Sequence, residues 1–212
     1  DWSSDVCSSD LELVCEDAQQ GLTALARSLH AEARAAGLQT VAITGSAGKT
    51  STKDLLAQIL AAVGPTVSPA GSHNNELGNP LTVCQIDERT RYLVSEMGAR
   101  GDGHIAWLCS IVPPRIGVVL NVGHAHLGEF GSVEAIAQAK GELVEALPAD
   151  GWAVLNADDP LVLAMASRTA ARPATFSLAG EPDADELAAL VTVLARHRTH
   201  RSCVELFRGR RQ

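Results

Sequence analysis

The feature that most restricts the fold of this chain is a short apolar strand followed by a glycine-rich turn and a helix. Residues 40–44 read Thr-Val-Ala-Ile-Thr, a β-branched run of the kind that forms a buried strand. A helical pattern then runs from about residue 49 to residue 62, where Gly64 and Pro65 stop it. Strand, glycine turn and helix in this order predict the start of a β-α unit.

The same alternation repeats along the chain. Further strands are predicted over residues 91–96, 116–121, 152–155 and 174–176, and helices over residues 104–109, 133–147 and 161–167. Alternating strands and helices predict an α/β fold, with a parallel sheet covered by helices on both faces. Residues 69–80 are too polar and too rich in glycine for either element. We predict a loop there, at the edge of the sheet where ligands bind.

Composition and charge exclude several classes of protein. The 212 residues are 46% hydrophobic and 20% charged, which is typical of one globular domain or slightly more. A net charge of -8 opposes general attraction to nucleic acid or anionic lipid, and no apolar run is long enough for membrane insertion. The five cysteines are scattered without a CxxC pair, and no signal peptide is recognisable. We therefore expect reduced thiols, a cytoplasmic location and a monomer.

The two ends of the chain differ from its body. Residues 1–11 resemble translated sequencing-adapter read-through, so we interpret them as a non-native leader, with a natural disordered arm as the alternative. Residues 12–38 are predicted to hold a linker helix ending at Gly37, and residues 39–180 the α/β domain. Six of the 17 basic residues lie in the last 17 positions. Residues 181–212 thus form an atypical basic tail, either native or produced by a frameshift.

A phosphate-binding loop is the strongest functional signal. Its spacing, GxxGKT, is shorter than the generic GxxxxGK[ST] pattern, but it lies between a predicted strand and a predicted helix, as such loops do. Glycines let backbone N–H groups turn inward, Lys49 supplies a cation for the β and γ phosphates, and the Thr50 hydroxyl is placed to bind Mg²⁺. A tight turn with a solvated lysine is the alternative. The predicted nucleotide-binding residues here are Gly45, Ser46, Ala47, Gly48, Lys49, Thr50 and Ser51.

Two further residues are candidates for a magnesium site, because both follow predicted strands at the same edge of the sheet. Glu96 ends the strand over residues 91–96, and His126 lies in the segment after residues 116–121. Carboxylate oxygens suit Mg²⁺. A residue at a strand end can equally be a solvated loop residue, so spacing by itself leaves both interpretations open.

Five blocks in order resemble the central domain of the Mur ligases. They are VAITGSAGKTSTK, GSHNNELGNPLT, VSEMGARGDGHIAWL, LNVGHAHLGEFGSVEAIAQAKGELVEALP and VLNADDP, and the resemblance covers about residues 16–178. Asn74 and Asn75, in an NN-x-x-G-x-P substrate loop, are similar to the members that join D-Ala-D-Ala to UDP-MurNAc-tripeptide, rather than to those adding other amines or to folylpolyglutamate synthase. Asn79 stands where an aliphatic residue is expected.

The resemblance implies roles for single residues. Lys49 and Thr50 would hold the phosphates and a first Mg²⁺, with Glu96 and His126 contributing to metal coordination. Lys140 would be carbamylated, which reverses its charge and supplies oxygen ligands. The catalytic residues would be Lys49, Lys140 and His126.

Two of these assignments have structural alternatives. On spacing alone, Lys140 is an exposed helical lysine paired with Glu142 or Glu145. Asn156 resembles a nucleotide-binding residue of the family. It and its neighbours Asp158 and Asp159 could equally cap a helix.

The resemblance also implies a reaction, ATP-dependent amide formation in peptidoglycan precursor synthesis. The tripeptide carboxylate would attack the γ-phosphate of ATP to give an acyl phosphate, from which the amine of D-Ala-D-Ala displaces phosphate. The sequence lacks the family's two other domains, so we expect a fragment limited to Mg·ATP binding. The alternatives are a homologue that adds a different amine and a non-catalytic P-loop binding module; a regulatory GTPase would carry an NKxD motif, which does not follow the loop.

Overall fold

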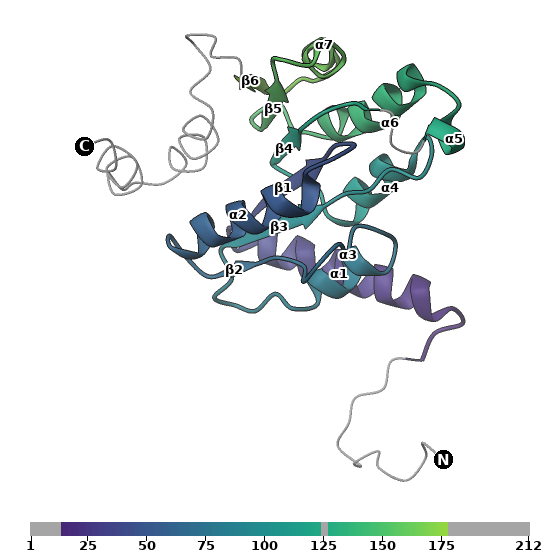
Figure 1. Cartoon of the computed structure of the whole chain (residues 1–212). Coiled ribbons are helices and arrows are strands. Elements are labelled where there is room, and N and C mark those ends of the chain that lie inside the picture. The colour runs from purple at the N-terminus through teal and green to yellow at the C-terminus, as the bar shows by residue number, and fades with distance from the viewer. Residues whose placement is uncertain (1–13, 124–126, 178–212) are drawn as a thin grey trace, which may run out of the picture.

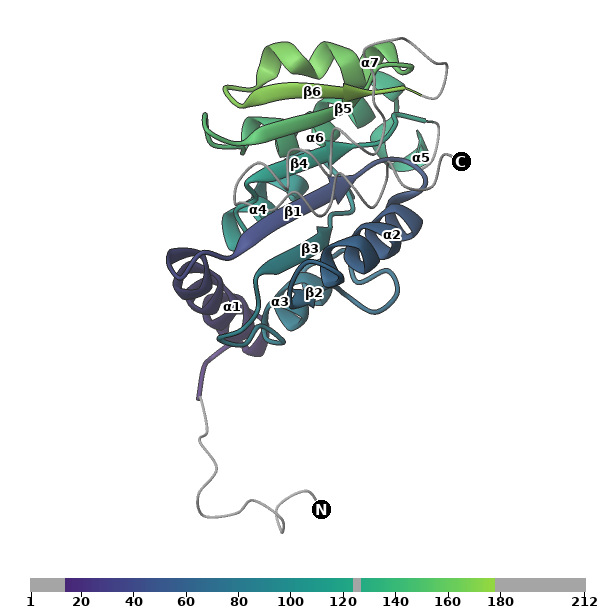
Figure 2. The same ribbon diagram turned by 90° about the vertical axis from the view of Figure 1, so that its left-hand side faces the viewer.

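The computed structural model describes residues 14–123 and 127–177 of the chain. Its centre is a six-stranded sheet with the strand order β2-β3-β1-β4-β5-β6, and every neighbouring pair is parallel (Figures 1 and 2). The predicted parallel sheet is confirmed. The strands are β1 (Gln39–Thr44), β2 (Thr66–Val67), β3 (Tyr92–Glu96), β4 (Ile116–Val119), β5 (Trp152–Asn156) and β6 (Arg172–Phe176).

Helices cover both faces of this sheet, as predicted. Helix α2 packs on one face, and α1, α3, α4, α6 and α7 pack on the other (Figure 2). No helix in the described residues is both long and apolar enough to span a lipid bilayer. The helices are α1 (Ala18–Ala35), α2 (Lys49–Ala61), α3 (Gly78–Val83), α4 (His104–Ile111), α5 (Leu127–Phe130), α6 (Val133–Glu145) and α7 (Pro160–Leu163), which continues into the 3-10 helix η1 (Ala164–Arg168).

Two apolar cores hold these layers together. Val41 and Ile43 of β1 pack against Leu56 and Leu60 of α2, whereas Ala42 of the same strand belongs to the core on the opposite face. A strand buried on both faces needs a continuous apolar sequence rather than an alternating one. Each fully buried leucine or isoleucine contributes about 1.5–3 kcal/mol, so packing of the helices stabilises the sheet.

Local residues define the helix ends. The Asp17 carboxylate accepts a hydrogen bond from the Gln20 amide at 2.7 Å and caps α1, and the Ser132 hydroxyl accepts one from the Ala135 amide at 3.1 Å and caps α6. Gly37, with φ of 107°, lies just beyond the end of α1. The predicted helix stop at this glycine is confirmed.

Helix α3 corrects the prediction of a continuous loop over residues 69–80. The loop ends at Leu77, and the helix starts with Gly78, Asn79 and Pro80. Proline is tolerated there because amides in the first turn have no intrahelical acceptor. Five of the six residues of α3 are buried, so tertiary packing stabilises a helix that its sequence does not favour.

Other differences concern short elements and ends of elements. Strand β2 and helix α5 were not predicted, and the predicted helix over residues 161–167 is divided between α7 and η1. Strand β4 ends at Val119 instead of residue 121, and β6 begins at Arg172 instead of residue 174. Pro173 is accommodated in β6 because that strand lies at the edge of the sheet.

The middle of the sheet positions the candidate site. Strand β1 lies between β3 and β4, with Ile43 beside Glu96 and Thr44 beside Val119. Because all strands are parallel, the loops after β1, β3, β4 and β5 gather at the carboxyl end of the sheet. The direction of strand order changes at β1, and ligands of open α/β sheets bind at such a point.

Candidate functional site

The predicted phosphate-binding loop leaves β1 at this edge and leads directly into α2. Gly48 has φ of 81°, a conformation that glycine adopts without strain, and Lys49 is the first residue of the helix. A Cβ atom on Gly45 would lie 2.9 Å from the Leu120 side chain, so only glycine fits there. The loop therefore combines a tight turn with the positive end of a helix dipole, which together favour an anion.

Lys49 and Thr50 point to different partners. The Lys49 ammonium donates a 2.8 Å hydrogen bond to the Gly45 carbonyl, which folds the lysine back over the loop. The Thr50 hydroxyl donates a 2.9 Å hydrogen bond to Oε2 of Glu96 at the end of β3. This contact joins the P-loop to the carboxylate that was predicted to bind magnesium.

Glu96 is the centre of the candidate site. Its side chain belongs to a residue only 1% exposed, and its second oxygen, Oε1, accepts hydrogen bonds from Asn74 at 2.8 Å and from Ser72 at 3.5 Å. The carboxylate is therefore held between Thr50, which follows the P-loop glycines, and the loop that carries Ser72 and Asn74. A hard carboxylate beside a threonine hydroxyl and a phosphate-binding loop fits Mg²⁺, which keeps several waters and needs only one or two protein oxygens.

The two asparagines of the predicted substrate loop have different surroundings. Asn74 contacts Glu96, whereas the Asn75 side chain accepts hydrogen bonds from the backbone amides of Leu77 and Gly78, at 3.2 and 2.9 Å, where α3 begins. Asn75 therefore shapes the loop in this structure, and Asn74 is the residue that reaches the site.

Asn79 holds the backbone at the end of β3, where Glu96 lies. It is 2% exposed, donates a 3.1 Å hydrogen bond to the Glu96 carbonyl and accepts one from the Ser95 hydroxyl. Asparagine is accommodated where an aliphatic residue was expected, because its buried amide has polar partners on the end of β3.

The loop after β4 also holds the P-loop, through residues that sequence analysis missed. The Asn121 side chain accepts from the Ala47 amide at 2.9 Å and donates to the Ala47 carbonyl at 3.1 Å. The Gly123 amide donates to the Ser46 hydroxyl at 2.8 Å. The position of Asn121 in the sequence could have indicated its role, because it ends a predicted strand and so lies at the same end of the sheet as Glu96.

Lys140 is buried on α6 and is only 4% exposed. Burial, followed by the nearby positive charge of Lys49, lowers the pKa of Lys140 from 10.5 to about 8. Neither Glu142 nor Glu145 pairs with its ammonium group. The alternative of an exposed lysine paired with Glu142 or Glu145 is therefore wrong.

Both of those glutamates have other partners. The Glu142 carboxylate accepts hydrogen bonds from the backbone amides of Gly103 and Ala106, at 2.6 and 2.8 Å, and so caps α4. Burial raises the pKa of Glu142. Glu145 pairs instead with Arg168 of η1 at 2.9 Å. Glu142 thus links α6 to α4, and Glu145 links it to η1. These contacts determine the position of Lys140.

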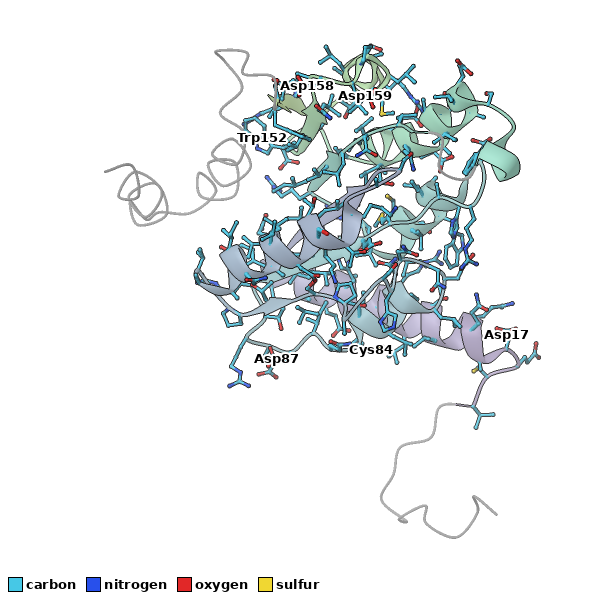
Figure 3. All side chains as sticks on the ribbon, viewed as in Figure 1. Asp17, Cys84, Asp87, Trp152, Asp158 and Asp159 are labelled. Carbon is cyan, nitrogen blue, oxygen red and sulfur yellow. The ribbon has the colours of Figure 1, made fainter. Side chains whose placement is uncertain are left out.

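The residues after β5 are engaged in local structure. Asn156 donates a 2.9 Å hydrogen bond to the Leu120 carbonyl and accepts one from the Asp158 amide. Asp159 caps α7 and also accepts a 2.7 Å hydrogen bond from the Val122 amide; Figure 3 shows it next to Asp158. The capping alternative therefore describes Asp159.

The remaining candidates differ in how the structure places them. Ser51 is exposed on the first turn of α2. His126 lies outside the described residues. In the described part of the chain, no three His, Cys, Asp or Glu side chains converge as a metal cluster. A cavity of about 390 Å³ lined by His30, Arg34 and Pro113 lies against α1. It is at the end of the sheet where β4 begins, whereas Glu96 lies where β3 ends.

Comparison with known proteins relates this site to one family. The Mur ligase middle domain family matches residues 43–205, a range that continues past the boundary predicted at residue 180. The UDP-N-acetylmuramoyl-tripeptide–D-alanyl-D-alanine ligase of Mycobacterium bovis is 56% identical over 174 residues. That alignment covers 79% of this chain but only 34% of the relative, so the chain spans about a third of that protein's length.

Solved structures agree with the sequence comparison. MurF from Acinetobacter baumannii is 34% identical with a TM-score of 0.72, covering 77% of this chain and 36% of that one. The MurF ligase from Thermotoga maritima in complex with ADP is also 34% identical, with a TM-score of 0.70, covering 81% of this chain and 39% of that one. By its family match, its fold and these relatives, the chain belongs to the Mur ligase middle domain family.

Proposed function

We propose that this chain forms the Mg·ATP-binding domain of a cytoplasmic amide ligase that joins D-Ala-D-Ala to UDP-MurNAc-tripeptide in peptidoglycan precursor synthesis. The observation that carries the proposal is the contact between Thr50 of the P-loop and Glu96 at the end of β3. It combines an anion-binding loop with a magnesium-type carboxylate. The substrates are proposed from the M. bovis relative, which bears that enzyme's name.

The residues of the chain would act mainly by positioning and charge neutralisation. The P-loop amides and Lys49 would hold the β and γ phosphates. The tripeptide carboxylate oxygen would bond to the γ-phosphorus as the bond to the β-γ bridging oxygen breaks, giving an acyl phosphate and ADP. The D-Ala-D-Ala amine would then form the amide bond, with phosphate leaving from the acyl carbon and the amine proton passing to solvent.

Thr50 and Glu96 would hold one Mg²⁺, and we propose that His126 and carbamylated Lys140 complete the metal site. The metal would neutralise charge on the transferring phosphoryl group. Carbamylation requires the neutral amine, which bonds to the carbon of CO₂ and releases a proton. The lowered pKa of Lys140 supports this step. A ¹³C-carbamate signal from labelled bicarbonate should disappear in Lys140→Gln; its absence from the native chain would refute the modification.

The nucleotide site can be tested by calorimetric titration of the chain with Mg·ATP. We expect saturable binding that Lys49→Ala weakens by about 10- to 100-fold, the value of a hydrogen bond to a charged group. Arg89→Ala is the control, because Arg89 is an exposed cation in the segment before β3 that pairs with Asp87. No binding by the folded chain would contradict the proposal. Equal binding by Lys49→Ala would favour the alternative of a non-catalytic module.

Whether the chain alone catalyses ligation needs a separate assay. We expect the chain, supplied with ATP, UDP-MurNAc-tripeptide and D-Ala-D-Ala, to bind Mg·ATP without forming the amide product. Mass spectrometry of the reaction mixture detects that product. Its formation by this chain would contradict the expectation that the third of the relative's length present here is limited to nucleotide binding.

A further inference from the structure

The use of lysine in this chain is selective. Fourteen of the 17 basic residues are arginines, and only Lys49, Lys53 and Lys140 are lysines. Two of these belong to the candidate site. Lys53 has no assigned role, although it lies on α2 one turn after Lys49 and Thr50 and therefore on the same side of that helix.

Lys53 is fully buried, with 0% of its surface exposed. Its ammonium donates hydrogen bonds to the backbone carbonyls of Pro69, at 2.5 Å, and Gly71, at 2.8 Å. A third contact, at 2.8 Å, is made with the half-exposed carboxylate of Asp54. All three donors of the ammonium are thus used, and two of them hold the backbone of one loop.

That loop is the one that reaches Glu96. Gly71 is followed directly by Ser72, and Ser72 and Asn74 are the two side chains that donate to Oε1 of Glu96. The other oxygen of Glu96 accepts from Thr50, which is carried by the same helix as Lys53. One helix therefore determines both sides of the Glu96 carboxylate, directly through Thr50 and indirectly through Lys53 and the loop.

We propose that Lys53 is a positioning residue, which anchors the loop over residues 69–77 so that Ser72 and Asn74 hold Glu96 for Mg²⁺. The inference deepens the proposed function and rests on it for the identity of the metal site. A lysine suits this role better than the arginine used elsewhere in the chain. Its compact ammonium donates to three acceptors from a fully buried position, whereas arginine carries a larger, planar guanidinium with donors fixed in a fork.

Hydrogen exchange tests the anchoring without any ligand. In Lys53→Met, which keeps the length of the stem but removes the donors, we expect amides of residues 70–77 to exchange at least about tenfold faster, the minimum effect of losing a bond from a charged group. The Gly98 amide, which donates to the Asn74 carbonyl at 3.0 Å, should follow them. Lys53→Gln, a milder change, should give a smaller effect in the same segment.

Leu60→Ala is the control for a merely structural role, because Leu60 is buried on α2 two turns further along and does not belong to the loop. We expect it to lower the melting temperature without speeding exchange selectively in residues 70–77. If both Lys53 variants exchange there as the native chain does, or if Leu60→Ala has the same local effect, the proposal is overturned.

Titration with ADP separates this inference from the proposed function. In EDTA, Lys53→Met should bind ADP within about twofold of the native chain, since Lys49 and the P-loop are unchanged. The gain in affinity on adding Mg²⁺ should fall by at least about tenfold. A gain equal to that of the native chain overturns the positioning role. If the native chain binds no nucleotide, the function proposal fails, while hydrogen exchange still decides whether Lys53 anchors the loop.

Discussion

At the scale of single residues, burial changes the chemistry of side chains whose sequence context is ordinary. Lys140 is buried on α6 near the positive charge of Lys49, and both effects disfavour its charged form. With a pKa of about 8, it has an amine that is neutral far more often near pH 7 than that of an exposed lysine. The lowered pKa of Lys140 is a property of the folded chain, because both of its causes arise only on folding.

His30 is the residue for which we expect the clearest pH dependence. Burial, followed by the charge of Arg34, lowers the pKa of His30 from 6.5 to about 4, and its Nε2 lies 2.8 Å from the Thr40 hydroxyl. The stabilisation from neutral His30 is complete above pH 6.5 and is lost as the pH falls from 6.5 towards 4, because the unfolded chain takes up the proton first. The loss reaches roughly 3 kcal/mol.

Urea unfolding between pH 4 and pH 7 measures this effect. In His30→Gln, which keeps an amide for Thr40 but does not titrate, the free energy of unfolding should fall less steeply over the same interval. Identical slopes for the two proteins would show that His30 is not the group responsible.

At the scale of secondary-structure elements, helix α6 joins two parts of the site. It carries Lys140, and it also supplies the Glu142 carboxylate that caps the start of α4. Two backbone amides at the start of α4 depend on that single side chain, since Gly103, the residue before the helix, has no side chain to cap it. The position of α4 and the position of Lys140 are therefore linked.

We expect Glu142→Ala to lower the free energy of unfolding by about 1–3 kcal/mol, because it leaves the Gly103 and Ala106 amides without their acceptor. Chemical denaturation measures the loss. Glu145→Ala is a matched control on the same helix, because its partner Arg168 is reached across a partly exposed ion pair worth about 0–1 kcal/mol. Equal losses in the two variants would contradict the capping role of Glu142.

At the scale of the whole molecule, two cores on opposite faces of the sheet join it to helices α1, α2, α3, α4, α6 and α7. The larger core contains Cys109 together with residues of α1, α3, α4, α6 and α7. Burial, and then the charge of Glu142, raises the pKa of Cys109 to about 12, whereas Cys15 and Cys84 are exposed. The reactivity of Cys109 should therefore report opening of the whole core.

We expect a thiol reagent at pH 8 to modify Cys15 and Cys84 quickly and Cys109 only when the chain unfolds. Leu143→Ala, in the same core, should speed modification of Cys109 by at least about 30-fold, since such substitutions cost about 2–5 kcal/mol. The exposed control Leu55→Ala should leave the rate unchanged. Peptide mapping by mass spectrometry measures each site. Rapid labelling of Cys109 in the folded native chain would contradict this account.

Much of the architecture was predictable because it depends on local patterns. The β-branched run of β1, the glycines after it and the apolar periods of α2 and α6 lie within short stretches, so spacing alone indicates each element. Helix α3 and strand β2 were missed because the first is stabilised by burial of Gly78 and Asn79 and the second has only two residues. Neither leaves a periodic pattern.

The sequence by itself determined the alternation of the longer strands and helices along the chain, the P-loop with Lys49 and Thr50, and the end of the sheet at which Glu96 lies. Only the tertiary structure decided that Glu96 is shared between Thr50, 46 positions away, and Asn74, 22 positions away. It also decided that Lys53 is buried, with its ammonium on the carbonyls of Pro69 and Gly71. The physical reason is range: element formation follows neighbours in the chain, whereas burial, hydrogen-bond partners and pKa values depend on residues that meet only when the sheet is assembled.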